Sequence, residues 1–285
     1  MVKYKVNSDG KIDDEAVFQP LVYTAVYGSD VYYESLMIFL ESIVKYGKYD
    51  GKIAIFSDRK KEEMAKYIPE SVSDRVVIVA MDHKDYSQRY VSSSFAMEDF
   101  SPIIYFDNDI VFNSSVHPIL QRVAQASGIC VVTENESYPE MSSKRIADIT
   151  DDRRIGNWWG LEIIRSDSNC SDKILPLANS GIIGWSDYCI FRAVGRLVFD
   201  LYHSKPNEGV AKWFGDQPFL NYALVRTGLV DYEALRNTCR FLGSTESFSG
   251  ERRGLVHFNW ARNEDKPRRM RAYMDYLILN KVNEP

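Results

Sequence analysis

Short apolar runs alternate with amphipathic stretches through the first half of the chain. The apolar runs are rich in β-branched and aromatic residues and predict strands at 20–27, 52–56, 76–80, 103–106 and 129–132. The stretches between them predict helices at 30–47, 58–67, 88–100 and 116–126. Strands and helices that alternate at this pace predict an α/β fold around a mostly parallel central sheet.

The alternation stops in the segment 134–173, which is polar, rich in Asp, Ser and Arg, and contains Trp158 and Trp159. Beyond it, strands are predicted at 177–185 and 255–258, and helices at 187–202, 217–226 and 267–279. The sequence contains no repeat and no Gly/Ser-rich linker. We therefore expect a single domain over residues 1–285, with an insertion at about 134–173 on its binding face.

Composition narrows the class of protein. Hydrophobic residues make up 45% of the chain, enough for a substantial core, and the net charge is −5. A general nucleic-acid binder carries a basic excess, so this class is disfavoured. No apolar signal region and no 18-residue apolar run occurs, so we expect a soluble, cytoplasmic protein without a transmembrane segment; contact with a membrane surface stays open. The four cysteines form no C-x-x-C pair, and we expect buried thiols at Cys130, Cys170, Cys189 and Cys239.

Two carboxylates, Asp107 and Asp109, interrupt an apolar run that extends from Ile103 to Phe112. Such a run is typical of a strand covered on both faces, and open α/β sheets bind ligands at the carboxyl ends of their strands. Two desolvated carboxylates cost several kcal/mol unless a cation joins them. Hard oxygen ligands suit Mg²⁺ or Mn²⁺. A chance pair on a solvated loop is the simpler alternative, but the apolar residues on both sides favour a metal site.

Four short motifs follow one another in an order that resembles one enzyme family. They are Asp107-Asn108-Asp109, Asn179-Ser180-Gly181, Asp216-Gln217 with Asn221, and His257-Phe258 followed by Lys266-Pro267. In this order the chain resembles glycosyltransferases of family 8, which includes glycogenin and bacterial lipopolysaccharide galactosyltransferases. The resemblance implies the GT-A nucleotide-diphospho-sugar transferase fold, with a Rossmann-like sheet flanked by helices.

The resemblance also implies roles for the motif residues. Asp107 and Asp109 bind Mn²⁺ or Mg²⁺ together with His257, and Asp107 with Asn108 lies at the ribose of a UDP-sugar. Asn179 and Ser180 meet the donor sugar, and Gly181 permits close backbone approach. Asp216 contacts the same sugar, and Gln217 lies beneath its anomeric carbon. Simpler alternatives remain for three residues: His257 as a satisfied core histidine, Asp216 as a helix cap, and Gly181 as part of a strand bulge.

The nucleotide pocket is expected along the first strand and the start of the first helix. Its candidate residues are Thr24, Ala25, Tyr27, Asp30 and Tyr32. Asp30 as a helix cap and Tyr32 as a packing residue are the alternatives.

Arg89, in the segment before the Asp-x-Asp strand, is the candidate that grips the donor, and a surface arginine is the alternative.

The chain departs from the family pattern in two places. The closing motif lacks the second Gly and the Trp, so Arg262, Arg268 or Arg269 compete with Lys266 for the pyrophosphate. The segment 134–173 matches no family motif, and its position suggests that Trp158 and Trp159 stack on an acceptor sugar; filling a core is the alternative.

These observations predict a metal-dependent glycosyltransferase. It moves a sugar from a UDP-sugar to a saccharide, glycan or lipid-linked glycan, with retention of configuration and with the leaving phosphate helping to deprotonate the acceptor. One alternative is an inverting GT-A enzyme with Asp216 or Asp187 as general base. A nucleotidyltransferase is disfavoured because residues 23–30 hold a single glycine, Gly28. The last alternative is a non-catalytic module that binds nucleotide-sugars.

Overall fold

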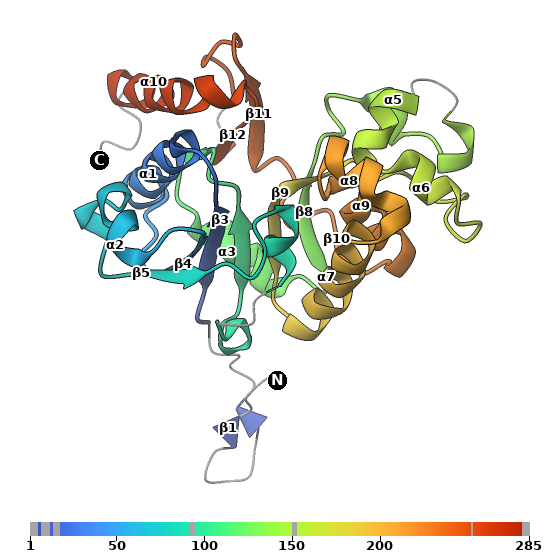
Figure 1. The fold of residues 1–285 in the computed structure, drawn as a ribbon, viewed down its shortest axis with the longest axis horizontal. Helices are drawn as coiled ribbons and strands as arrows, with labels where there is room; N and C mark the ends of the chain where they lie inside the picture. The colour runs from blue at the N-terminus through green and yellow to red at the C-terminus, as the bar shows by residue number, and fades with distance from the viewer. Residues whose placement is uncertain are drawn as a thin grey trace.

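The structure is a computed structural model of the 285-residue chain, and it describes residues 5–6, 12–13, 18–91, 95–149, 153–251 and 253–280. Two short strands near the N-terminus, β1 (Lys5–Val6) and β2 (Ile12–Asp13), pair with each other in antiparallel orientation. The rest of the described chain builds two sheets and the helices around them (Figure 1).

The larger sheet has seven strands in the order β10-β8-β9-β6-β3-β4-β5. These strands are β3 (Leu21–Val26), β4 (Lys52–Ser57), β5 (Val76–Ala80), β6 (Ile103–Phe106), β8 (Ile129–Thr133), β9 (Ala178–Trp185) and β10 (Val230–Asp231). The pairs from β6 through β3 and β4 to β5 are parallel, whereas β9 runs antiparallel to β6 and β8. The predicted α/β fold with a mostly parallel central sheet is confirmed.

Helices cover both faces of this sheet. They are α1 (Asp30–Lys45), α2 (Lys61–Met64), α3 (His117–Gln125), α7 (Tyr188–Tyr202), α8 (Glu208–Phe214), α9 (Gln217–Thr227) and α10 (Lys266–Leu279), with 3₁₀ turns η1 (Ala65–Tyr67), η2 (Glu70–Val72), η7 (Lys205–Asn207) and η8 (Asn263–Asp265). Figure 1 shows α1 and α2 on one side of the sheet and α7 to α9 on the other.

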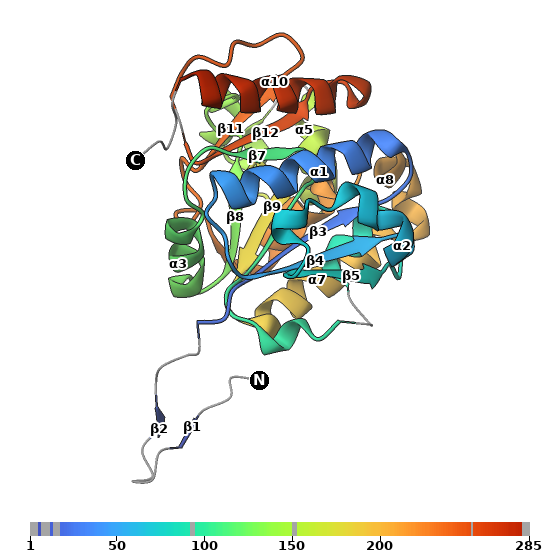
Figure 2. The ribbon, with the colours of Figure 1, turned by 90° about the vertical axis from the view of Figure 1, so that its left-hand side faces the viewer.

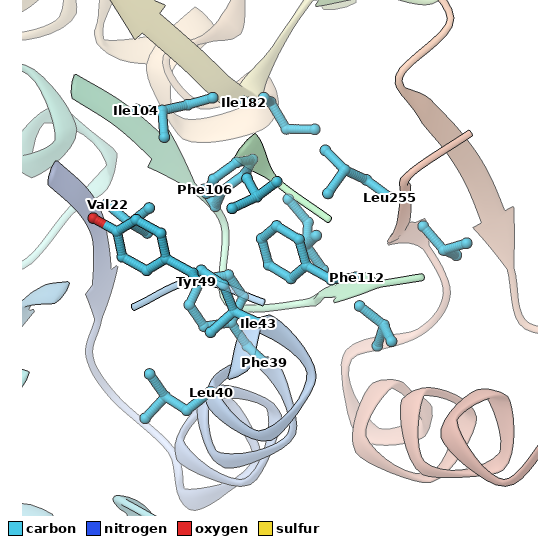
Figure 3. Close-up of a cluster of buried hydrophobic side chains, with 14 of the residues drawn as sticks. Val22, Phe39, Leu40, Ile43, Tyr49, Ile104, Phe106, Phe112, Ile182 and Leu255 are labelled. Atoms are coloured by element: carbon cyan, nitrogen blue, oxygen red, sulfur yellow. The ribbon is translucent and has the colours of Figure 1, made fainter. Parts of the chain in front are cut away.

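Alternate residues of each strand enter different cores, as the two-residue period of a strand requires. Along β6, Ile104 and Phe106 join the core under α1, whereas Ile103 and Tyr105 join the core under α7 and α9. Figure 3 shows Ile104 and Phe106 in one cluster with Phe39 of α1, and the ring centroids of Phe39 and Phe106 lie 6.3 Å apart. Because both faces are covered, the strands read as continuous apolar runs in the sequence.

The smaller sheet was not predicted as a sheet. It has the order β11-β12-β7, with β7 (Ile110–Phe112), β11 (Cys239–Gly243) and β12 (Leu255–Trp260). The apolar run from Ile103 to Phe112 is thus two strands in two sheets, joined by the turn that carries Asp107 and Asp109. Helix α10 lies beside α1 above this sheet (Figure 2).

The prediction of a helix at 88–100 is wrong. The described part of this segment forms two 3₁₀ turns, η3 (Tyr86–Tyr90) and η4 (Met97–Asp99), and residues 92–94 lie outside the described chain. Gln88 and Arg89 are buried and hydrogen-bond to backbone groups at Val91 and Ser180. These tertiary contacts override the local helical pattern. The charged helix predicted at 58–67 is also shorter, since α2 begins at Lys61 and is followed by η1.

The segment 134–173 contains short helical turns instead of a loop. These are α4 (Pro139–Ser142), η5 (Ile146–Asp148), α5 (Arg153–Gly156), η6 (Asn157–Trp159) and α6 (Leu161–Arg165). They surround a small core of their own, which includes Trp159, Leu161 and Cys170 and also takes in Val225 of α9. Cys130, Cys170 and Cys239 are buried free thiols as predicted, whereas Cys189 in the first turn of α7 is exposed.

Asn221 fixes α9 against the start of β9. Its buried amide accepts a hydrogen bond from Ala178 N at 2.9 Å and donates to Ala178 O at 2.8 Å, so it acts as a short strand partner. The same amide nitrogen donates to Gln217 O at 2.9 Å. This side chain therefore sets the distance between the Asn179–Gly181 motif and the Asp216–Gln217 motif.

We predict that Asn221→Ala destabilises the protein, because one buried donor and one buried acceptor of Ala178 lose their partner, at about 1–3 kcal/mol each. Urea unfolding monitored by circular dichroism measures this loss. The matched control is Asn280→Ala at the exposed end of α10, which should change stability by less than about 0.5 kcal/mol. Equal stability of the two variants would contradict the role of Asn221.

Candidate active site

Three backbone segments meet at the carboxyl end of β6. Asp107 N donates to Gly181 O of β9 at 2.7 Å, and Phe258 N of β12 donates to Asp109 O at 3.0 Å. The antiparallel register of β12 and β7 places His257 opposite Ile110, next to Asp109. The register between β8 and β9 shifts at Val131/Val132, so residues around Ser180 and Gly181 leave the regular ladder. The two predicted motifs and His257 are therefore brought together by strand pairing.

Asp107, Asp109 and His257 form a group with the geometry of a metal site. Their potential ligand atoms all lie within 4.8 Å of one another. His257 Nε2 lies 3.0 Å from Asp109 Oδ1 and 3.7 Å from Asp107 Oδ2. Both ring nitrogens of His257 and Asp109 Oδ1 are buried and find no well-oriented hydrogen-bond partner among the described residues. His257 Nε2 and Asp109 Oδ1, two buried polar atoms 3.0 Å apart without well-oriented hydrogen-bond partners among the described residues, fit a bound divalent ion.

Lys266 supplies the nearest positive charge. Its ammonium lies 2.6 Å from Asp109 Oδ2. Burial alone raises the pKa of Asp109, but the charges of Lys266 and His257 lower this pKa well below its ordinary value. Asp109 therefore stays ionised at neutral pH despite its burial.

Gly181 allows this close approach. A Cβ atom at this position would lie 2.5 Å from Asp107 Oδ2 and still closer to the His257 ring. No side chain fits there unless the two groups move apart. This geometry agrees with the expectation that Gly181 permits close approach of the backbone. The β-bulge at this point contributes to the approach.

Arg89 joins two carboxylates beside the metal group. Its guanidinium lies 3.1 Å from Asp107 Oδ1 and 3.3 Å from Asp216 Oδ2, and it donates to Ser180 O at 2.7 Å. It is only 6% exposed, so the surface alternative for Arg89 is wrong. The Tyr105 ring lies 4.9 Å below the guanidinium.

Asp216 stands at the start of α9 but does not cap it. Its side chain makes no capping bond and instead accepts from Tyr90 Oη at 2.6 Å and from Ser180 Oγ at 3.2 Å. Burial raises the pKa of Asp216, and Arg89 opposes this shift. The side chain is thus directed at the site and not at its own helix.

Gln217 and Asn179 connect the site to the segment 134–173. Gln217 accepts from Ser180 N at 3.2 Å and donates to Trp158 O at 3.3 Å. Asn179 accepts from Gly181 N at 2.9 Å and donates to Glu134 Oε1 at 2.8 Å. Glu134 was missed as a site residue, although it follows the buried strand β8 as Asp107 follows β6. Its burial raises the pKa of its carboxyl group.

Two clefts meet at the metal group. The β3 cleft includes Ala25, Tyr27, Tyr32 and Asn108 among its lining residues, together with Asp85 and Asn263. The α9 cleft is lined by the residues of the Asn179 and Asp216 motifs, by His257 and Glu134, and by Trp158, Trp213 and Trp260. Both clefts share Tyr86, Arg89, Asp107, Asp109 and Lys266. A ligand in one cleft therefore touches the groups that face the other.

Two predicted residues lie outside both clefts. Thr24 is fully buried within β3. Asp30 lies in the first turn of α1 behind the N-cap Ser29, where its exposed carboxylate pairs with Arg59. Strand alternation explains Thr24, because its neighbour Ala25 faces the cleft while Thr24 faces inward.

The two adjacent tryptophans of the segment 134–173 differ in their exposure. Trp159 borders the same α9 cleft as Trp158 but is 2% exposed and packs in the core of that segment, so its ring is not free to stack on a sugar. Trp158 is 48% exposed and lines the α9 cleft, where its ring packs edge-on against Phe214 at 5.1 Å. Trp213 and Trp260, which are 74% and 42% exposed, line the same cleft and were missed. An exposed Trp leaves no periodic signal in the sequence.

The arginines that compete with Lys266 lie elsewhere. Arg268 pairs with Asp265, and Arg269 donates to the backbone of Gly243 and Glu246. Neither they nor Arg262 lines the β3 cleft or the α9 cleft, whereas Lys266 lines both.

Searches by sequence match no protein-family profile and no curated protein. By structure, the chain is similar to mouse xyloside xylosyltransferase 1 in its apo form, with a TM-score of 0.49 and 13% identity over 84% of this chain and 96% of that one. It is also similar to the galactosyltransferase LgtC in complex with donor and acceptor sugar analogues, with a TM-score of 0.49 and 12% identity over 90% of this chain and 95% of that one. No helix in the described part of the chain is both long and apolar enough to span a membrane.

We predict that Gly181→Ala weakens divalent-metal binding at least about 10-fold, because the added methyl group forces Asp107 and His257 apart. Titration with Mn²⁺ by calorimetry or electron paramagnetic resonance measures the change. Gly209→Ala in α8 is the matched control, since a Cβ there meets no described atom within 4 Å. Unchanged Mn²⁺ affinity in Gly181→Ala would show that the group binds no metal through Asp107 and His257.

Proposed function

We propose that this protein is a metal-dependent glycosyltransferase of the GT-A type that uses a UDP-sugar as donor. The observation that carries the proposal is the meeting of two clefts at Asp107 and Asp109, which form a potential metal group with His257 of the α9 cleft. Transfer of a glycosyl group needs a donor and an acceptor that both reach one reacting carbon. Two clefts that share one charged centre provide this arrangement.

The β3 cleft is the candidate nucleotide pocket. Tyr27, Tyr32 and Tyr86 give it aromatic walls suited to a base. Asn108 is held by a long hydrogen bond to Ala25 O at 3.4 Å, and Asn263 donates to Tyr32 Oη at 2.9 Å. These amides and hydroxyls are suited to the ribose and the polar edge of uracil.

The diphosphate of the donor belongs at the shared centre. Asp107, Asp109 and His257 would hold Mn²⁺ or Mg²⁺, which supplies charge neutralisation for a leaving diphosphate. Lys266 and Arg89 add fixed positive charge on either side of the carboxylates. Without a cation, the carboxylates and the diphosphate repel each other.

The sugar end of the donor belongs beside Asn179, Asp216 and Gln217 in the α9 cleft. Both oxygens of Asp216 are already engaged by Arg89, Tyr90 and Ser180, so Asp216 is suited to position hydroxyl groups. Asp187, the other candidate base, caps α7 through Cys189 N and Ile190 N and lines neither cleft. With Gln217 near the reacting carbon, Asp216 engaged and Asp187 outside both clefts, we favour retention of configuration.

Glu134 supports the second candidate, an inverting enzyme. It is a buried carboxylate in the α9 cleft, and its raised pKa suits a general base. Proton NMR of the product separates the two: an α-linked product from an α-linked donor supports retention, and a β-linked product makes Glu134 the base.

The acceptor is proposed to enter the α9 cleft from the side of the segment 134–173, which we regard as an insertion that serves acceptor binding. Trp158, Trp213 and Trp260 expose flat apolar rings to this cleft. Such rings suit the apolar faces of saccharides, and we therefore propose a saccharide or glycan acceptor.

We predict that UDP binds at least about 10-fold more tightly with Mn²⁺ than with EDTA, because the cation removes the repulsion between diphosphate and carboxylates. Calorimetry measures both affinities. Asp109→Asn should remove most of the Mn²⁺ effect, whereas Asp200→Asn on the exposed face of α7 should leave it intact. Equal UDP affinity in EDTA and Mn²⁺ would contradict the proposal, and binding without hydrolysis or transfer of any UDP-sugar would favour a non-catalytic module.

We predict that Trp158→Ala and Trp213→Ala raise the KM for acceptor several-fold, while donor hydrolysis stays near the wild-type rate. Loss of stacking acts on the acceptor alone. Assays compare transfer to a panel of aryl glycosides with UDP-sugar hydrolysis. Phe18→Ala, an exposed aromatic outside both clefts, is the control. Parallel loss of hydrolysis and transfer would place these rings in the donor site.

A further inference from the structure

We propose that His83, Asp85 and His203 form a second metal site, separate from the carboxylate group and suited to Zn²⁺. One potential ligand atom from each residue lies within 4.8 Å of the other two. Two imidazoles and one carboxylate are a common donor set for zinc, with a further position for water. The inference goes beyond the proposed function and does not depend on it.

The two imidazoles come from segments far apart in the sequence. His83 precedes η3, and His203 is the residue that ends α7. Their ring centroids lie 5.4 Å apart, and both rings pack against Phe199, at 4.9 Å and 4.5 Å. The chain contains only four histidines, and two of them meet here beside an aspartate. An apolar ring beneath two imidazoles limits access of water to one side of the site.

Ser87 orients two of the three candidate ligands. Its hydroxyl lies 2.6 Å from Asp85 Oδ1 and 3.0 Å from His203 Nε2. Ser87 N also donates to Asp85 Oδ1 at 2.8 Å. If the hydroxyl donates to Asp85, then His203 donates from Nε2 and keeps the lone pair on Nδ1 for a metal. Hydrogen bonds of this kind, to the far side of metal ligands, fix their orientation and tautomer.

The position of the site gives it a consequence for the β3 cleft. Asp85 and Tyr86 line that cleft, and Arg89 of the same turn lies between Asp107 and Asp216. Gln88 already holds the turn by accepting from His83 N at 2.8 Å. A metal that joins His83 and Asp85 to His203 would tie this turn to the end of α7. Zinc would therefore stabilise the wall of the cleft that carries Tyr86 and Arg89.

A simpler explanation of the same contacts is local capping. Asp85 caps η3 through Ser87 N, and His203 stands at the C-terminus of α7, where an imidazole is favourable. Capping explains each residue alone. It does not explain why potential ligand atoms of both imidazoles and the carboxylate lie within 4.8 Å of one another, and it predicts no metal affinity.

The experiment is zinc titration of the full-length chain by calorimetry, in a variant that lacks the first metal group, Asp109→Asn with His257→Ala. We expect one Zn²⁺ per chain to remain in this background. Adding His203→Ala should weaken that binding at least about 10-fold, and Ser87→Ala should weaken it about 10-fold or more. His117→Ala, at a histidine whose ring contacts Lys48 O, is the matched control and should change nothing.

No zinc binding in this background, or binding that His203→Ala leaves unchanged, would overturn the second site. If the background variant does not fold, the stoichiometry of the wild type replaces it: two Zn²⁺ per chain, falling to one in His203→Ala, is expected, and an unchanged number contradicts the proposal. Because no nucleotide is present, failure here is independent of failure of the glycosyltransferase proposal. Absorption of bound Co²⁺ gives a second readout of the same site.

Discussion

The placement of two carboxylates just beyond one strand, one of them buried, is the constraint on which the rest of the structure depends. Asp107 directly follows β6 and is half-buried, whereas Asp109, two residues further on, is buried, and a desolvated carboxylate costs several kcal/mol without compensation. The compensation comes from distant parts of the chain: Arg89 from η3, Lys266 from α10 and His257 from β12. The smaller sheet exists at this place because β12 pairs with β7 beyond the carboxylate turn. The part of the chain that helps to compensate the charge of the carboxylates therefore also joins the two sheets.

Close packing of polar groups around this turn requires a gap in the side-chain layer. Gly181 provides it, and the register shift of β9 turns Asn179 and Ser180 toward the same centre. Asn221 and Gln217 then hold β9 against α9 through amide hydrogen bonds. The motifs that carry the proposed chemistry are thus also the points that hold sheet and helix together. A substitution in one of these motifs therefore changes the geometry of the site first, and the reacting groups only as a consequence.

The two clefts differ in character although they share one centre. The β3 cleft belongs to the parallel half of the sheet and is walled by tyrosines and amides. The α9 cleft is bordered by the segment 134–173 and by exposed tryptophans. The Gln217 contact with Trp158 O links that segment to the centre directly. In the proposed function, this division separates the donor side from an acceptor side that the segment 134–173 borders.

The sequence by itself determined the strands of the larger sheet except β10, since strands covered on both faces are continuous apolar runs, and it placed Asp107 and Asp109 at a strand end, but it did not show the smaller sheet. The order of the motifs along the chain also predicted which residues lie near these two carboxylates. Tertiary structure alone decided the rest. Arg89 lies in the site because its buried hydrogen bonds hold this segment out of the predicted helix. Asp30 lies outside the site, where it pairs with Arg59. Trp158 and Trp159, adjacent in sequence, differ in burial because a short helical turn points neighbouring side chains in different directions: Trp158 is exposed to the α9 cleft, and Trp159 packs in the core of the segment 134–173 at the edge of that cleft. The local sequence pattern indicates which residues are buried, but it does not indicate which distant partner each buried charge will meet.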